Sequence, residues 1–262
     1  MMTLVKHELW RERCTLAVWT VSIGVLMAIC VFLYPEMKDE MDGMTEMFAS
    51  MGAFTAAFGM DRLNFGTFIG FYAVECGNIL GLGGAFFACL IAIGALSKEE
   101  KERTAEFLLT HPISRSRVVT EKLIGILLQV TVLNIVVLGL AVFSVLAIGE
   151  ELPLRELGLL HLAYYLLQIE LAGICLGLSA LLRRGGLGVG IGLAAVMYFL
   201  NLVANISDGV DFLKYITPFG YTEGANIVAN GSLDTVQVSL GLLFAVLGII
   251  AAYQIYGKKD IY

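Results

Sequence analysis

Six long apolar runs, separated by short polar stretches, constrain the fold of this 262-residue chain more than any other feature. A helix of about 20 apolar residues crosses the hydrocarbon core of a bilayer, and each run is long enough to do so. Only 15% of the residues are charged, whereas a soluble globular domain carries about 25%. We therefore exclude a soluble protein and predict one transmembrane domain over residues 1–262. The predicted spans are 15–34, 74–96, 123–148, 157–182, 186–206 and 234–256.

Lysine and arginine are distributed unevenly among the polar stretches. If the six runs cross the membrane alternately, 13 of the 17 basic residues fall on one side. Three precede the first span, six lie in 97–122, two are Arg183 and Arg184, and two follow the last span. Because basic residues accumulate on the cytoplasmic side, we expect both termini to be cytoplasmic. The four bases on the other side are Lys38, Arg62, Arg155 and Lys214.

The expected fold is an all-α membrane protein with six transmembrane helices and several short helices outside the membrane. Residues 2–14 predict an amphipathic helix at the interface. Pro35 is expected to end the first span, because proline disrupts a helix interior. The apolar run that begins at residue 67 is longer than one span requires, so a re-entrant or interfacial piece is expected before residue 74. Residues 207–232 predict a pair of short external helices before the last span.

Methionine recurs through the first external loop, residues 36–66. Its spacings of three and four predict a helix with a soft apolar face. The alternative is a copper-binding methionine cluster. Helical packing explains the pattern without a metal, so we predict no metal site. The methionines are Met37, Met41, Met44, Met47, Met51 and Met60.

The expected external face is strongly acidic, with 13 Asp and Glu residues against the four bases. Such a field attracts cations or cationic peptides. It is equally explained as the complement of the basic cytoplasmic side.

The stretch 97–122 is the only long charged run in the chain. Ser97 followed by Glu100 has the form of a capping box, which predicts a helix over about 98–110. Pro112 predicts a turn at 111–114, followed by a helix that continues into the third span. The first helix ends in Phe107-Leu108-Leu109. A charged helix with an apolar end favours a docking element, and the alternative is a solvated loop that only satisfies topology.

This stretch resembles the hallmark segment between the second and third spans of ABC-2 type transporter permeases. The resemblance rests on Glu99-Glu100, 104–109, Pro112 to Arg115, and Lys122, with Arg103 and Ala105 departing from the usual pattern. It implies a cytoplasmic coupling helix that sits in a groove of a separate ATPase subunit. The residues implied to couple to the ATPase are Glu99, Glu100, Arg103, Thr104, Glu106, Phe107, Leu108 and Pro112.

The chain lacks the motifs that a self-contained motor or enzyme needs. It has no GxxxxGK[ST] sequence to cradle phosphates. Its three histidines are too widely spread for a metal-hydrolase site. We therefore expect no catalysis by this chain itself and no directly bound cofactor, with ATP and Mg²⁺ entering through the partner ATPase.

Two carboxylates lie inside apolar runs, Glu75 near the outer edge of the second span and Glu170 near the middle of the fourth. A charge at mid-bilayer costs about 2.5–3.5 kcal/mol, so such groups are protonated, paired or directed into a cavity. We consider both as candidates for the translocation path. The alternative is a protonated, hydrogen-bonded acid with a structural role.

Alternating glycines open the fifth span, at Gly186, Gly188, Gly190 and Gly192. They form two small-xxx-small pairs, which allow close helix packing in a membrane. The partner is either another span of this chain or the same span of a second copy, so these glycines are candidates for dimer packing.

The sequence therefore predicts the permease subunit of an ATP-driven exporter in the plasma membrane. Short external loops favour a small amphipathic, peptide-like or drug-like cargo. Expected partners are an ABC ATPase, a second permease copy of the same or a related sequence, and membrane lipids, with no nucleic acid. The alternative is a stand-alone ion-coupled secondary transporter that uses Glu75 and Glu170. A membrane enzyme is disfavoured because no catalytic constellation is present.

Overall fold

The computed structural model describes residues 3–98, 114–182 and 186–259, and within these ranges the chain forms helices and no strand. Six helices are long and apolar enough to cross a membrane, as expected from the six apolar runs. They are α2 (Arg13–Ser50), α4 (Phe68–Gly94), α7 (Arg115–Ile148), α8 (Leu154–Leu181), α9 (Leu187–Ile206) and α11 (Thr235–Lys258).

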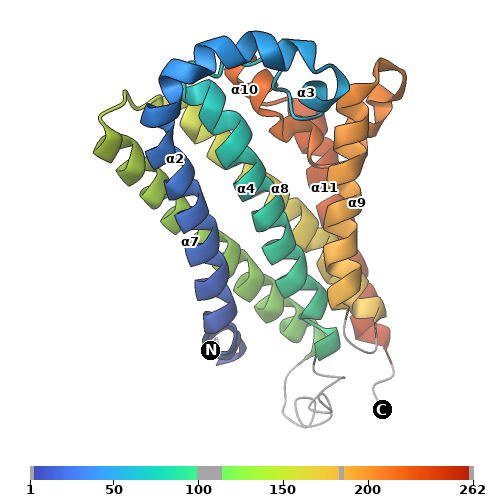
Figure 1. Cartoon of the computed structure of the whole chain (residues 1–262). Coiled ribbons are helices and arrows are strands. Elements are labelled where there is room, and N and C mark those ends of the chain that lie inside the picture. Colours follow the sequence, from blue (N-terminus) through green and yellow to red (C-terminus); the bar gives the residue numbers. More distant parts are fainter. Residues whose placement is uncertain (1–2, 99–113, 183–185, 260–262) are drawn as a thin grey trace.

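The short elements gather at the two ends of the bundle (Figure 1). We call one end the terminal end, because it carries α1 (Thr3–Arg11) and the last turn of α11. The opposite end, the cap end, carries α3 (Ala53–Ala57) and α10 (Gly224–Asn230). Two 3₁₀ helices, η1 (Asp208–Tyr215) and η2 (Gly220–Thr222), connect α9 to α10. The predicted short helices before the last span are therefore confirmed.

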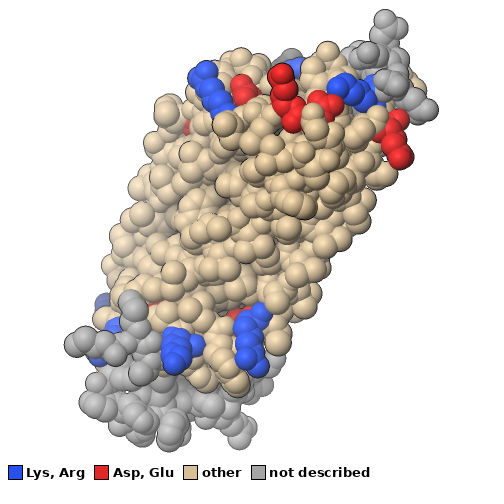
Figure 2. Space-filling model, turned by 90° about the vertical axis from the view of Figure 1, so that its left-hand side faces the viewer, with Lys and Arg blue, Asp and Glu red and all other residues tan. Residues whose placement is uncertain are grey.

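Charged side chains lie near the two ends on the face that Figure 2 shows, with an uncharged band between them. This distribution is typical of a membrane-spanning protein, because charged groups in hydrocarbon are costly. α9 and α11 bury the smallest share of their residues among the six spans, and many of their apolar side chains are exposed. A membrane would cover them.

α2 differs from its predicted end at Pro35. The proline lies inside α2, which continues to Ser50, although its membrane-spanning part is Arg13–Lys38. The final part of α2 bends over the top of the bundle (Figure 1). A proline kinks a helix when packing holds both halves. Tyr34 supplies such packing, because its buried hydroxyl donates to the carbonyl of Gly66 at 2.9 Å.

α4 is one continuous helix from Phe68, without the re-entrant piece that was expected before residue 74. Thr67 caps its first turn by accepting a hydrogen bond from the backbone N–H of Gly70. The cap explains why the helix begins earlier than the predicted span. Ser114 caps α7 in the same way, through the N–H of Arg117, and α7 begins at Arg115 as the helix that was predicted to continue into the third span.

α4 and α8 are the most buried spans and form the centre of the bundle. α8 packs directly on α11 through glycines. A Cβ at Gly177 would lie 2.6 Å from the carbonyl oxygen of Gly248, and one at Gly248 would lie 2.5 Å from that of Gly173. The two backbones touch because no side chain separates them, as small residues allow in membrane helices.

Each of the four bases at the cap end has a local partner. Three of these partners are carboxylates, and the fourth is a backbone carbonyl. The contacts are Lys38 with Glu150 at 2.7 Å, Lys214 with Asp211 at 3.0 Å, Arg62 with Glu223, and Arg155 with the carbonyl oxygen of Gly231 at 3.0 Å.

Candidate functional site

The amphipathic helix α1 lies against α7 at the terminal end. Val5 and Glu8 are buried on its inner face, whereas Trp10 is 63% exposed on the outer side. The backbone N–H of Leu4 donates to Oε2 of Glu121 at 3.0 Å. α1 is therefore attached through polar contacts as well as apolar packing.

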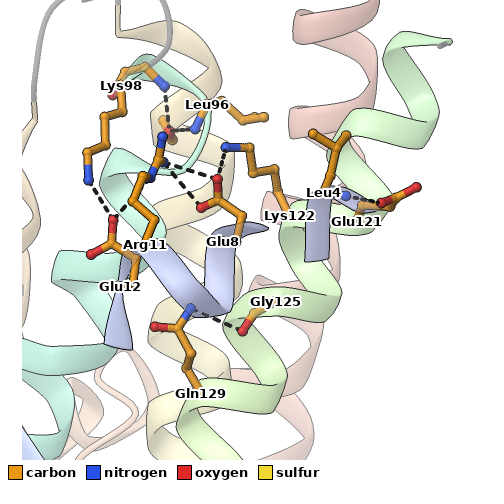
Figure 3. Close-up of polar contacts among 12 residues, drawn as sticks. Leu4, Glu8, Arg11, Glu12, Leu96, Lys98, Glu121, Lys122, Gly125 and Gln129 are labelled. Atoms are coloured by element: carbon orange, nitrogen blue, oxygen red, sulfur yellow. Dashed lines mark hydrogen bonds and ion pairs between the residues drawn. The ribbon is translucent and has the colours of Figure 1, made fainter. Parts of the chain in front are cut away.

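A buried ion pair fixes α1 on α7 (Figure 3). Nζ of Lys122 lies 2.7 Å from Oε1 of Glu8. The Lys122 side chain is 1% exposed and that of Glu8 is 9% exposed. Arg11 also approaches Glu8, at 3.1 Å. Buried charges persist only when they are paired in this way.

The residues that precede 99–113 are held by α8 and by the junction between α1 and α2. Nζ of Lys98 lies 2.5 Å from Oε1 of Glu12, between α1 and α2. Oγ of Ser179 on α8 accepts hydrogen bonds from the backbone N–H groups of Leu96 at 2.9 Å and Ser97 at 3.3 Å. The end of α4 is thus attached to α8 and to the start of α2.

The residues that follow 99–113 are held by the end of α11. Nη1 of Arg115 donates to the carbonyl oxygens of Tyr256 at 3.3 Å and Lys259 at 2.5 Å. Nζ of Lys259 in turn donates to the carbonyl oxygen of Leu182 at 2.8 Å, at the end of α8. Both flanks of 99–113 are therefore anchored to the ends of spanning helices.

A cavity of about 180 Å³ lies inside this cluster. Its wall includes the charged groups of α1 and α7 and the base of α9. Charged side chains of both signs line one part of it, and the larger part of its wall is apolar. Lining residues include Glu8, Arg11, Glu12, Lys98, Lys122 and Gly186.

The residues predicted to couple to an ATPase lie outside the described ranges. These are Glu99, Glu100, Arg103, Thr104, Glu106, Phe107, Leu108 and Pro112. The structure describes only the anchors on either side of them.

Glu75 and Glu170 occupy different seams of the bundle. Glu75 is half-buried on α4, where Cys30 of α2 is its electrostatic neighbour. Glu170 on α8 is fully buried against α11, where a Cβ at Gly241 would collide with its Oε2. The two carboxylates are thus not brought together.

The four glycines at the start of α9, of which Gly186 is the N-cap, lie on two sides of the helix. A Cβ at Gly186 or Gly190 would meet Ile93 of α4 at 2.8 Å, so these two allow close packing within the chain. A Cβ at Gly188 or Gly192 would meet nothing within 4 Å. Only the second pair lies on a side that a second copy can reach.

Polar side chains also pair inside the bundle. Oη of Tyr72 and Nε2 of His161 are hydrogen-bonded at 2.7 Å, and Nδ2 of Asn134 donates to Oε1 of Gln168 at 2.7 Å. Among the described residues, no three His, Cys, Asp or Glu side chains are grouped to hold a metal ion.

Sequence reasoning missed the role of Ser179 and the partner of Lys122. Both contacts join residues far apart in the chain, and no local pattern marks them. Glu8 was expected on the polar side of this helix, but its spacing of three residues from Val5 was a signal that both share the buried side. A buried acid there requires a basic partner.

Comparison with known proteins identifies the family. The family model described as "ABC-2 family transporter protein" matches residues 2–261. The chain belongs to the ABC-2 transporter family. Members of this family are the membrane-spanning permease subunits of ABC transporters, generally without catalysis of their own, and membership implies an ABC ATPase as partner.

This ABC-2 chain is also similar to a protein of Bacillus subtilis (strain 168), the uncharacterized protein YhcI. The two are 23% identical over 215 residues, which cover 72% of this chain and 68% of the relative.

Proposed function

We propose that this ABC-2 permease exports a small amphipathic, peptide-like or drug-like substrate, and that residues 99–113 couple it to the ATPase. Two permease copies and two ATPase subunits would form the working complex. The anchoring of both flanks of 99–113 carries this proposal. Leu96 and Ser97 are attached to α8, and Arg115 is attached to the end of α11. A push on the segment would therefore reach two spanning helices directly.

The charge distribution supports a cytoplasmic terminal end. Of the 17 basic residues, 13 belong to this end and its adjoining segments, and the remaining four lie at the cap end. The positive-inside rule then favours a cytoplasmic terminal end, on the side where ATP is available.

An apolar groove supports an amphipathic cargo. It has a volume of about 420 Å³ and lies between α8, α9 and α11. Leu178, Met197, Phe244 and Leu247 contribute to its wall. Apolar grooves of this size bury a substantial part of a small ligand. The stand-alone secondary transporter gains no support, because Glu75 and Glu170 lie in different seams.

The coupling proposal is tested with the double variant Phe107→Ala/Leu108→Ala. Interface energy is concentrated in a few apolar or aromatic anchors, and truncation of one costs about 2–4 kcal/mol. That loss weakens affinity by roughly 30- to 1000-fold. We expect normal membrane insertion, reduced capture of the ATPase in a pull-down, and loss of substrate-stimulated ATPase activity in reconstituted vesicles.

The matched control is Phe54→Ala/Leu154→Ala, which removes the same side chains from exposed positions at the cap end. It should retain wild-type ATPase capture and stimulation. Wild-type behaviour of the Phe107/Leu108 variant would mean that 99–113 is only a connector.

A further inference from the structure

Four of the five cysteines form two pairs in space, and each pair joins two spanning helices. The thiols of Cys30 on α2 and Cys76 on α4 are in hydrogen-bonding contact. The thiols of Cys89 on α4 and Cys175 on α8 are in contact in the same way. The members of each pair are far apart in the sequence. Only the packing of the helices brings these thiols together.

A second contact places Cys76 beside Cys30 independently. Sγ of Cys76 donates a hydrogen bond to the carbonyl oxygen of Met27 at 3.8 Å. In an α-helix the carbonyl at position i accepts from the N–H at i+4, so it points toward the next turn of the helix. Cys30 belongs to that turn. The sulfur of Cys76 therefore lies against the turn of α2 that carries Cys30.

The neighbouring turns of the two helices have the same register. α2 and α4 run in opposite directions between the two ends of the bundle (Figure 1). On the cap side of the thiols, the rings of Tyr34 and Phe71 are 5.4 Å apart. On the terminal side, a Cβ at Gly83 would lie 3.2 Å from Ile23. The contact between the thiols thus follows from how α2 packs on α4, not from the placement of one side chain.

The two pairs differ in accessibility. Cys30 is partly exposed, whereas Cys76 is 0% exposed. Cys89 and Cys175 are both 0% exposed. Oxidation of a thiol depends on its accessibility, and oxidant-sensitive cysteines often lie next to a second thiol that completes a disulfide. The first pair has both features, and the second pair lacks the accessible thiol.

The first pair lies in the half of the membrane nearer the cap end. Cys30 is about 12 Å along the helix axis from Lys38, the last residue of the membrane-spanning part of α2. Cys76 is about as far from Phe68, where α4 begins. Hydrogen peroxide is small and uncharged, so it can reach this depth without the cost of placing a charge in hydrocarbon.

We propose that Cys30 and Cys76 are a modification site at which hydrogen peroxide forms a disulfide between α2 and α4. The Cys30 sulfur attacks one peroxide oxygen, the O–O bond breaks, and the other oxygen leaves as water with the thiol proton. The Cys76 sulfur then attacks the resulting sulfenic acid and displaces its hydroxyl, which leaves as a second water with the Cys76 proton. The two sulfurs together lose two electrons, and the peroxide gains them.

Such a bond would restrain α2. This helix buries a much smaller share of its span than α4 does, and its end continues over the cap (Figure 1). The disulfide would close a covalent loop that contains this end of α2, α3 and the start of α4. A cross-link of this kind stabilises a fold mainly by reducing the freedom of the unfolded chain.

The experiment maps the bond in the full-length chain, oxidised with hydrogen peroxide in native membranes and alkylated before solubilisation. A protease site inserted after Gly52, in the exposed turn before α3, divides the chain. In a Cys14→Ser background, Cys30 is the only cysteine of the first fragment. We expect the two fragments to stay joined on a non-reducing gel after oxidation and to separate when a reductant is added.

Cys76→Ala removes the second thiol and should abolish this linkage. The matched control is Cys89→Ala, which changes another fully buried cysteine of α4 and should retain the linkage. Without the protease site, the oxidised wild type should melt at least about 3 °C above its reduced form. Cys76→Ala should show no such difference. If Cys76→Ala fails to assemble, Cys30→Ala at the partly exposed position gives the same comparison.

Separation of the fragments after oxidation would overturn the proposal, as would oxygen atoms added to Cys30, by mass spectrometry, without a bond to Cys76. A linkage that survives in Cys76→Ala would assign Cys30 to another partner and would also overturn it. A linkage without any rise in Tm would refute the restraint of α2. None of these outcomes bears on the coupling proposal, which the Phe107/Leu108 variant tests without peroxide.

Discussion

Glu8 and Lys122 lie 114 positions apart in the chain, and their side chains meet in a buried ion pair of 2.7 Å. The pair joins α1 to α7 beside the anchors of residues 99–113 (Figure 3). Apolar packing alone would tolerate many positions of an amphipathic helix on a membrane surface. A buried ion pair restricts the helix to one position, because either charge without its partner is unfavourable in the protein interior.

Breaking this pair should destabilise the protein strongly. Lys122→Met should lower the free energy of unfolding by about 3 kcal/mol, the lower part of the range for buried pairs. The lower part applies because Arg11 still approaches Glu8. Denaturant unfolding in detergent micelles measures the effect. The control is Lys38→Met, which removes an exposed pair with Glu150 and should cost at most about 1 kcal/mol. Equal losses in the two variants would refute the assignment.

The space at Gly84 is filled by Gln168. An added Cβ would collide with Nε2 of Gln168, whose side chain is fully buried and accepts a hydrogen bond from Asn134. Gly84→Ala should therefore reduce stability by about 1–3 kcal/mol. Gly94→Ala on the same helix meets nothing within 4 Å and should be neutral or stabilising. Thermal unfolding of both variants gives the comparison, and a loss in Gly94→Ala alone would contradict it.

The contact between α8 and α11 should be intolerant of any side chain. Gly177→Ala places a methyl 2.6 Å from the carbonyl oxygen of Gly248, so one backbone must move. We expect a lower Tm and a lower yield of assembled permease. Gly158→Ala, on the same helix with nothing within 4 Å, is the control. A Tm of Gly177→Ala at or above that of the control would show that the helices separate easily.

Two acids outside the spans should affect stability with opposite pH dependence. Burial acts to raise the pKa of Glu12, but the hydrogen bond and charge of Lys98 outweigh it and lower the pKa below 4.5. Its stabilisation is present above pH 4.5 and is lost as the pH falls through the lowered pKa. Burial raises the pKa of Glu223 above 4.5, against the charge of Arg62. Stability is then highest below pH 4.5 and falls as the pH rises through the raised pKa.

The measurement is the Tm of the wild type, Glu12→Gln and Glu223→Gln between about pH 3 and pH 8. The Tm difference between the wild type and Glu12→Gln should grow with pH. The difference between the wild type and Glu223→Gln should shrink or reverse. If both Tm differences changed in the same direction with pH, the environment of either Glu12 or Glu223 would be misassigned.

Cross-linking tests whether a second copy packs on α9. Gly188→Cys lies on the outward side, and Gly190→Cys lies against α4 within the chain. A short thiol cross-linker in native membranes should give a dimer band for Gly188→Cys above that of the wild type, and no increase over the wild type for Gly190→Cys. Absence of the band at Gly188 would place the contact between copies elsewhere.

Much of the fold was predictable because a membrane-spanning helix can be recognised from its own apolar sequence. The start and end of α8, α9 and α11 fall within three residues of the predicted spans. The helix through Pro35 was not predictable from its own sequence. There, tertiary support from Tyr34 outweighs the local tendency of proline to end a helix.

The candidate sites were predictable only as residue types. An acid in an apolar run drew attention to Glu170, but its neighbours Tyr221 and Gly241 come from segments far away in the chain. The glycines of α9 could be predicted as packing positions. Which of them faces inward depends on how α9 is rotated about its axis relative to α4, and this rotation turns Gly190 inward and Gly188 outward. The local sequence does not determine this rotation.

The glycine contact between α8 and α11 has a mechanical consequence. No side chain lies between the two backbones there, so no change of rotamer can let the helices slide past one another. α8 and α11 therefore move as one rigid unit. Ser179 of α8 bonds to the backbone at the end of α4, and Glu170 lies nine residues away from Ser179 on α8. That separation is about 14 Å along the axis. A displacement of α8 at Ser179 is therefore transmitted along the helix to the Glu170 carboxylate with little loss.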